Sequence, residues 1–273
     1  MVISKQTKYE KACSNGNINI VKKLLPQVDI AHDTYIGFIS ACINGHFDIV
    51  KYHVDNIPKL NIHINKDEPF VQACWNNHLS IAKYLYNLDE KKHNIIIKKG
   101  TPILNTYPGL SFKRIAPLTC NWLLKNFGPK SNNPLISKKI LTKLSMNCAE
   151  GGHYTMFKKL IEEYDINIDK TSGQIVYWAC RNYRYEILKY LVIKYGKKLN
   201  WKFEKYRAIK HLLREVVPNT ESTRKIVIML IRNNIFTLNK IILLTKELEL
   251  ESLASSKQAH LIEPNDIKKA LKL

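Results

Sequence analysis

The sequence predicts an all-α solenoid of stacked helix–turn–helix units, because one short frame recurs along it with regular spacing. The frame consists of two small residues, a two-residue gap, a Gly or Asn that is usually followed by His, and an amphipathic run. Its clearest copy is residues 36–55, IGFISACINGHFDIVKYHVD. The second small residue falls at Cys13, Cys42, Cys74, Ala149 and Cys180, so successive copies lie 29, 32, 75 and 31 residues apart. A period of about 33 residues is typical of units that bury their faces only against neighbours.

Each part of the frame has a physical reason. Paired small residues let the first helices of adjacent units approach closely. The Gly or Asn ends the first helix at a C-cap and allows the chain to reverse. The residues that follow, such as Ile49, Val50 and His53-Val54, have the spacing of a second helix with one buried stripe.

The frame divides the chain into four segments, and about seven units are expected in all. These segments are ordinary repeats at 1–89, a degenerate basic repeat or insertion at 90–133, ordinary repeats at 134–200, and divergent C-terminal repeats with a cap at 201–273. Prolines cut the second segment into short pieces, where 118–127 predicts the outer helix of a decayed unit. Further helices are expected at 136–151, 153–164, 174–182, 185–195, 206–216, 222–233, 238–253 and 264–273, with Gly196 as a C-cap.

Composition is that of a folded protein, with 45% hydrophobic and 24% charged residues. No apolar run of about 18 residues is present, so no membrane span is expected. The N-terminus lacks the apolar core of a secretory signal. Four of the six cysteines occupy one repeat column, Cys148 occupies the adjacent one, and Cys120 lies outside the pattern. We therefore expect reduced thiols in an intracellular protein, either cytosolic or nuclear.

The recurring frame resembles the ankyrin repeat, whose core reads A-A-x-x-G-H-x-x-I/V-V-x-x-L-L. The match includes Ala41-Cys42-x-x-Gly45-His46 and the divergent copy Ala179-Cys180-x-x-Tyr183-Arg184, and it covers about residues 1–200 apart from the decayed middle. The Asn-, Lys- and Ile-rich style also resembles the ankyrin proteins of giant amoebal DNA viruses such as mimiviruses. The resemblance implies a non-enzymatic protein–protein interaction module that acts as a monomer on a cellular protein. The viral resemblance implies that this cell is the infected host.

Ankyrin-family proteins bind with loop tips and with the concave face of the inner helices, so the resemblance points to residues directly after the small pair. The candidates are Ile43, Asn44, Trp75, Asn76, Arg181 and Asn182. Trp75 and Arg181 stand out, because Trp and Arg are enriched in interface hot spots. Packing of Trp75 against the next inner helix is an equal alternative, and Trp178 is expected in the core.

Charge suggests a second function. From Lys91 to Ala149 there are eleven Lys or Arg residues and no Asp or Glu, with aromatic residues between them. Such a stretch is compatible with nucleic-acid phosphates. Its alternative explanation is a Lys-rich composition with a solubilising surface. The candidates for nucleic-acid binding are Lys98, Lys99, Lys113, Arg114, Lys125, Lys130, Lys138 and Lys139.

The sequence gives little support for metal binding or catalysis. Cys42 with His46, and Cys74 with His78, have a spacing that can serve zinc, but a helix break separates each pair. No nucleophile, metalloprotease or phosphate-loop motif is present. We therefore expect no enzyme activity, no cofactor and no metal site. A third possible function is a ubiquitin-ligase substrate adaptor, although no Leu-Pro motif marks the C-terminal 40 residues.

Overall fold

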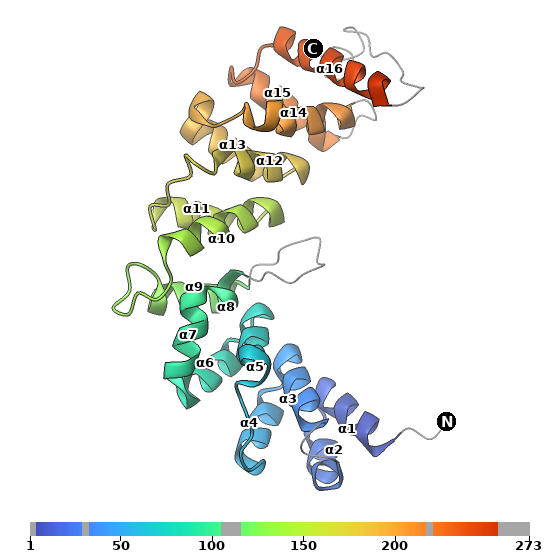
Figure 1. Cartoon of the computed structure of the whole chain (residues 1–273), viewed down its shortest axis with the longest axis vertical. Helices are drawn as coiled ribbons and strands as arrows, with labels where there is room; N and C mark the ends of the chain where they lie inside the picture. Colours follow the sequence, from blue (N-terminus) through green and yellow to red (C-terminus); the bar gives the residue numbers. More distant parts are fainter. Residues whose placement is uncertain (1–3, 29–32, 105–115, 217–220, 256–273) are drawn as a thin grey trace. The chain divides into compact units, whose positions relative to one another are not determined.

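The computed structural model describes residues 4–28, 33–104, 116–216 and 221–255. All regular elements in these residues are helices (Figure 1). The chain divides into two compact units, residues 1–141 and 142–273. Among the described helices, none has both the length and the apolar character needed to cross a bilayer.

The first unit contains three helix pairs followed by a less regular segment. The pairs are α1 (Lys5–Ser14) and α2 (Ile18–Leu24), α3 (Asp33–Asn44) and α4 (Phe47–Asn56), and α5 (Ile64–Trp75) and α6 (Leu79–Leu88), with a 3-10 turn at Leu25–Gln27. α7 (Glu90–Lys99), α8 (Thr101–Leu104) and α9 (Pro117–Phe127) follow. α1 packs on α3 and α3 on α5, while α2 packs on α4 and α4 on α6. The first unit therefore has an inner and an outer layer of helices.

The second unit repeats this arrangement. It contains most of α10 (Lys138–Gly151), with α11 (Tyr154–Glu162), α12 (Ser172–Arg181), α13 (Tyr185–Tyr195), a 3-10 turn (Gly196–Lys198), α14 (Phe203–Val216), α15 (Glu221–Arg232) and α16 (Leu238–Ser255). α12 packs on α14 and α14 on α16, while α13 packs on α11 and α15. The helices expected from the sequence are confirmed to within a few residues, and Gly196 is the C-cap of α13. The capping helix expected at 264–273 lies outside the described residues, and the four-segment division stays a prediction.

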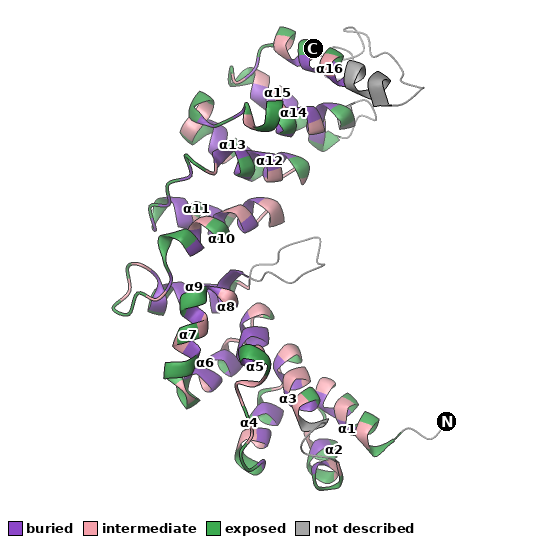
Figure 2. Ribbon diagram, in the orientation of Figure 1, coloured by how far each residue is buried: buried purple, intermediate pink, exposed green. Residues whose placement is uncertain are grey.

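Small buried residues allow the inner helices to pack closely. Cys13, Cys42, Cys74 and Cys180 are each fully buried in the same repeat column. None of the six cysteines, all of which lie in the described residues, forms a disulfide. Burial raises the pKa of the Cys13 thiol to about 12, because the charged thiolate loses its hydration. Figure 2 shows the buried side of the helices as purple stripes.

Hydrogen bonds from side chains link three of the repeats to the repeat before them. His46 Nε2 donates to the carbonyl of Ser14, and His78 Nε2 donates to the carbonyl of Ile43, both at 2.9 Å. In the second unit, Arg184 Nε donates to the carbonyl of Glu150 at 3.0 Å. We call these contacts inter-repeat hydrogen bonds. They give the second residue of the Gly-His pair a structural role.

The Gly of that pair is required for two reasons. Gly45 has a φ of +82°, a left-handed conformation that L side chains rarely adopt. A Cβ at Gly45 would also lie 2.5 Å from the ring of His78. Gly16 against His46 repeats this geometry, at 2.6 Å. The Gly therefore makes room for the inter-repeat hydrogen bond of the following unit.

The decayed middle keeps the outer helix that the sequence predicts, as α9. Asn77, with φ +66°, replaces the turn Gly, and its Oδ1 accepts from the backbone N–H of Leu118 and of Thr119 at the start of α9. The Thr119 hydroxyl donates to the carbonyl of Cys74 at 2.7 Å. α9 is thus joined to the third repeat by different groups. Alignment of its helix with α4 also places Cys120 in the column of Val50, which explains why it is 3% exposed.

α7 is a helix that the sequence analysis did not predict. Asp89 caps its N-terminus by accepting from the backbone N–H of Lys92, and left-handed Gly100 ends it. Its buried side chains are His93 and Ile97. α7 packs against α5 and α6. It is therefore an inserted helix that packs against the third repeat.

Candidate protein-binding surface

The candidate residues of the first unit lie at the C-terminal ends of consecutive inner helices. Asn44 ends α3 and is exposed, while Ile43 is half-buried. Trp75 ends α5 and is half-buried, and Asn76 is the exposed C-cap of that helix. Asn44 Nδ2 reaches the Ser14 hydroxyl of the preceding unit at 3.3 Å. Because α1, α3 and α5 pack side by side, these residues form one row. We call it the inner row.

The asparagines of this column have a structural role that the sequence analysis missed. Asn44 Nδ2 donates to the carbonyl of Ser40, and Asn76 Nδ2 donates to the carbonyl of Gln72, both at 2.9 Å. Asn182 makes the same bond to Trp178 in the second unit, at 3.0 Å. Each bond adds a side-chain donor to a carbonyl in the last turn of a helix; the Gln72 and Trp178 carbonyls also accept from the backbone N–H of Asn76 and of Asn182. The recurrence of Asn in one column was the available signal.

Trp75 is fixed in place by the next segment of the chain. Its indole N–H donates to the carbonyl of Thr101, the first residue of α8, at 2.9 Å. The ring therefore packs against the next inner segment, as the structural alternative expected. The half-exposed part of the ring remains on the inner row. Protein binding by Trp75 stays a prediction.

In the second unit, Arg181 belongs to an aromatic cluster at the end of α12. Its Nη1 donates to the Tyr177 hydroxyl at 2.8 Å, and its guanidinium lies 5.6 Å from the centre of the Trp178 ring. Arg207 of α14 lies 4.5 Å from the centre of the Tyr177 ring. Trp178 is half-buried, so the expectation that it lies in the core is wrong. The reason is that its helix turns this position toward Arg181, one turn on.

The basic candidates are spread over several elements. Lys98 and Lys99 lie in the last turn of α7, Lys125 on α9, Lys130 in the following loop, and Lys138 and Lys139 at the start of α10; all six are exposed. Lys113 and Arg114 lie outside the described residues. Lysines in the last turn of a helix interact favourably with its dipole, which gives Lys98 and Lys99 a local role.

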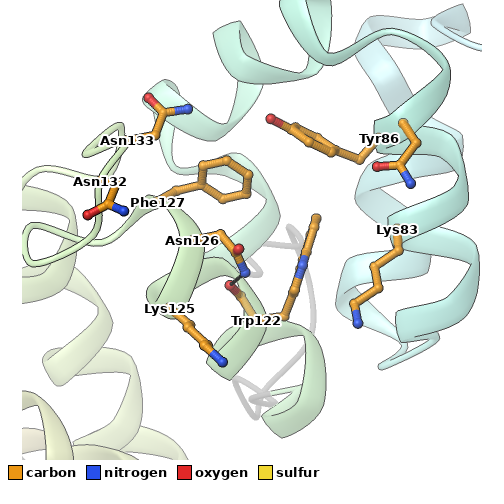
Figure 3. A pocket seen from close by; sticks show the side chains of 9 residues that line it. Lys83, Tyr86, Trp122, Lys125, Asn126, Phe127, Asn132 and Asn133 are labelled. Atoms are coloured by element: carbon orange, nitrogen blue, oxygen red, sulfur yellow. Dashed lines mark hydrogen bonds between the residues drawn. The ribbon is translucent and has the colours of Figure 1, made fainter.

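A cavity of about 560 Å³ opens between α6, α9 and the loop that follows α9. Tyr86, Trp122 and Phe127 contribute aromatic rings to it, and these rings contact one another edge to face or tilted at 5.2–5.7 Å between centres. Lys83 and Lys125 flank Trp122 (Figure 3). Asn126, Asn132 and Asn133 add amide groups. We call this the aromatic cavity. It was not predicted, because its residues come from two segments, 83–87 and 122–133, that no local spacing relates.

Comparison with known proteins supports the repeat fold. A family model described as ankyrin repeats (3 copies) matches residues 10–97. No curated protein matches the chain. The resemblance to viral ankyrin proteins therefore stays a prediction. Residues 10–97 are thus similar to ankyrin repeats, and the described residues form an all-α, ankyrin-like fold of stacked helix–turn–helix units with a degenerate middle.

Proposed function

We propose that this chain is a non-enzymatic protein–protein interaction module that binds its partner through the inner row. Ankyrin repeats are in general protein–protein interaction modules. The observation that carries the proposal is that the side chains of the inner row are held in place by hydrogen bonds within the chain itself. Asparagine caps and the Asn44–Ser14 contact hold its polar groups, and the Trp75–Thr101 bond holds its aromatic ring. A surface that is already ordered loses little conformational entropy on binding.

The chemistry of the partner follows from charge. The chain carries 43 Lys and Arg residues against 23 Asp and Glu residues. A net charge of +20 favours encounter with an acidic surface, because complementary charge raises association rates. We propose an acidic protein face as the partner and a monomeric chain as the binding form. The fully buried cysteine column supports a reduced, cytosolic or nuclear setting.

Site-specific photo-crosslinking tests the inner row. A benzophenone amino acid at position 44 is expected to capture a discrete protein from cell lysate, and the same group at exposed position 51 on α4 is the matched control. Nuclease treatment of the lysate must leave the crosslink intact. Equal capture from positions 44 and 51, or a product that disappears with nuclease, would contradict the proposal.

Trp75→Ala separates binding from folding. We expect this variant to weaken partner binding while helical circular dichroism at 222 nm changes little. Trp75→Phe keeps an aromatic ring and removes only the N–H that Thr101 accepts, so it should bind better than the alanine variant. Parallel loss of binding and helicity in Trp75→Ala would assign the side chain a purely structural role.

The aromatic cavity favours a second candidate, which is binding of single-stranded nucleic acid. Lys125 belongs to the basic stretch and lies with Lys83 beside the half-buried Trp122. Aromatic rings next to lysines suit base stacking with phosphate neutralisation. Lys125→Glu should weaken RNA binding in a fluorescence-anisotropy assay, with Lys51→Glu as the charge-matched control. A flat salt dependence or equal effects of the two variants would exclude this candidate.

The ubiquitin-ligase adaptor stays a prediction. Residues 256–273, where a C-terminal docking motif was sought, lie outside the described residues.

A further inference from the structure

Three side chains with metal-binding atoms lie close together where α7 packs against the third repeat. His63 precedes α5, Asp67 lies in the first turn of α5, and His93 lies on α7. Each offers one ligand atom, and these atoms all lie within 4.8 Å of one another. Two imidazoles and one carboxylate are a donor set that zinc enzymes and zinc-binding proteins use.

The distances between the groups are close to those of a coordination shell. His63 Nδ1 contacts Asp67 Oδ1 directly, and His93 Nδ1 lies 3.5 Å from the same oxygen. The rings of His63 and His93 have centres 4.7 Å apart. Ligands at about 2.05 Å from a tetrahedral zinc ion lie about 3.3 Å from one another. Entry of the ion would therefore require the His63–Asp67 contact to open while His93 stays nearly in place.

His93 gives an independent indication that the site takes a ligand. Its side chain is fully buried, and neither of its ring nitrogens has a hydrogen-bond partner among the described residues. Buried polar groups are normally satisfied, because an unpaired one loses its hydration without compensation. Phe70 and Tyr86 pack around the ring, with centres at 4.5 and 6.4 Å. The carboxylate of Asp67 lies 3.5 Å from His93 Nδ1.

Asp89 completes the arrangement on the outer side of His63. Its Oδ2 lies 3.2 Å from His63 Nε2, the nitrogen that points away from Asp67 and His93. Asp89 is itself fixed, since it caps α7. A histidine that binds a metal through one nitrogen usually donates its other N–H to a carboxylate, which orients the ring and raises its basicity. His63 is placed for this role.

Asp67 is prepared to act as an anionic ligand. Its Oδ1 contacts His63 Nδ1 directly and lies 3.5 Å from His93 Nδ1. Its side chain is 5% exposed, which shields the site from bulk water.

We propose that His63 Nδ1, Asp67 Oδ1 and His93 Nδ1 form a zinc site, with water as the fourth ligand and Asp89 as the outer carboxylate. The ion would tie α7 to α5 and so hold the inserted helix on the third repeat. It would also give His93 Nδ1 a partner, while His93 Nε2 keeps no hydrogen-bond partner among the described residues. Magnesium and calcium fit less well, because they prefer oxygen ligands alone.

Metal titration of the full, untagged chain tests the site. After dialysis against a chelator, the wild-type protein should bind one equivalent of Zn²⁺ by isothermal titration calorimetry and melt at a higher temperature with the ion. His63→Ala and Asp67→Asn should each weaken binding at least tenfold, and Asp89→Asn should weaken it about tenfold. His46→Gln, which changes a histidine used only between repeats, should bind like the wild type.

Cobalt distinguishes this site from the cysteines. Bound Co²⁺ should give visible bands of a tetrahedral site with nitrogen and oxygen ligands, and no thiolate-to-metal charge transfer in the near ultraviolet. His63→Ala changes a side chain that is 16% exposed and should keep its helicity, so its loss of binding can be separated from unfolding. A thiolate band, no Zn²⁺ binding by the wild type, or wild-type affinity in both His63→Ala and Asp67→Asn would overturn the proposal.

Discussion

Between the second and third repeats, the ring of His78 donates to the Ile43 carbonyl across a left-handed glycine. Between the third repeat and α9, the Thr119 hydroxyl donates to the Cys74 carbonyl, and Asn77 replaces the glycine. Both junctions place a donor on the carbonyl end of the preceding inner helix. The comparison teaches that both junctions place a side-chain donor near the end of the preceding inner helix, although the residue that supplies it changes and the accepting carbonyl shifts by one position of the repeat.

Gly45→Ala should damage the ordinary junction most. A left-handed alanine costs about 1–2 kcal/mol. Its Cβ would lie 2.5 Å from the His78 ring, which adds about 1–3 kcal/mol of overpacking. We expect a total loss of about 3 kcal/mol, measured by urea unfolding.

A double-mutant cycle checks this account of Gly45. Removal of the ring in His78→Ala should relieve the overpacking, so Gly45→Ala should cost only the backbone strain in that background. Asn77→Gly keeps the left-handed residue of the other junction and removes only its bonds to α9, so it should cost about 1 kcal/mol. Strict additivity of Gly45→Ala and His78→Ala would refute the steric explanation.

His53 should make the stability of the ordinary repeat depend on pH, whereas the corresponding position of the decayed repeat has no titrating group. Burial lowers the pKa of His53 to about 4, and its hydrogen bond to the Ile49 carbonyl opposes part of this shift. In α9 the corresponding position is Leu123, which is buried and does not titrate. Well above pH 6.5 the imidazole is neutral in both the folded and the unfolded state, so it has no effect on stability. As pH falls from about 6.5 to 4, the unfolded chain takes up a proton that the folded chain excludes, so about 3 kcal/mol of stability is lost.

His53→Leu provides the control for this pH effect. The variant lacks the titrating group, so the difference between its unfolding free energy and that of the wild type should change between pH 7 and pH 4.5. A difference that stays constant over this interval would show that His53 has an ordinary pKa.

Two cysteine substitutions test the alignment of the decayed unit. Cys42→Leu should destabilise by about 1–3 kcal/mol, because the inner column is fully packed. Cys120→Val should change stability by less than about 1 kcal/mol, because the corresponding position of α4 holds Val50. Thermal unfolding of both variants measures the contrast. Similar losses would mean that α9 does not occupy the outer-helix register.

Modest effects are expected for the two donors themselves. Thr119→Val and His78→Ala should each cost about 1–2 kcal/mol, because each removes a side-chain hydrogen bond to a carbonyl at a helix end. The Cys74 carbonyl keeps a bond from the backbone N–H of Asn77 at 3.3 Å, so Thr119→Val should be the milder of the two. Chemical denaturation compares the two values. A loss confined to His78→Ala would show that the hydroxyl of Thr119 does not replace the imidazole.

The fold could be predicted well from the sequence, and the candidate surface only in part. The small-residue columns and the turn Gly report directly on close packing, so helices such as α3 and α4 follow from them. α7 was missed because its buried positions, His93 and Ile97, are too few to set a period. The set of His63, Asp67 and His93 was missed because it depends on how α7 leans on α5, which no local spacing encodes. Trp75 could be placed on the inner row, but its bond to Thr101 depends on the position of α8.

The interchangeable donors of the junctions also bear on how such chains drift. His46, His78, Arg184 and Thr119 all satisfy a carbonyl of the preceding unit, although they differ in charge and size. Substitutions that preserve a donor can therefore accumulate without unstacking the helices. A search that scores residue identity will therefore stop detecting the repeat while its helices still stack. The family match, which ends at residue 97, is consistent with this behaviour. Counting repeats in rapidly changing genomes should therefore score the presence of a donor at this position as well as the residue type.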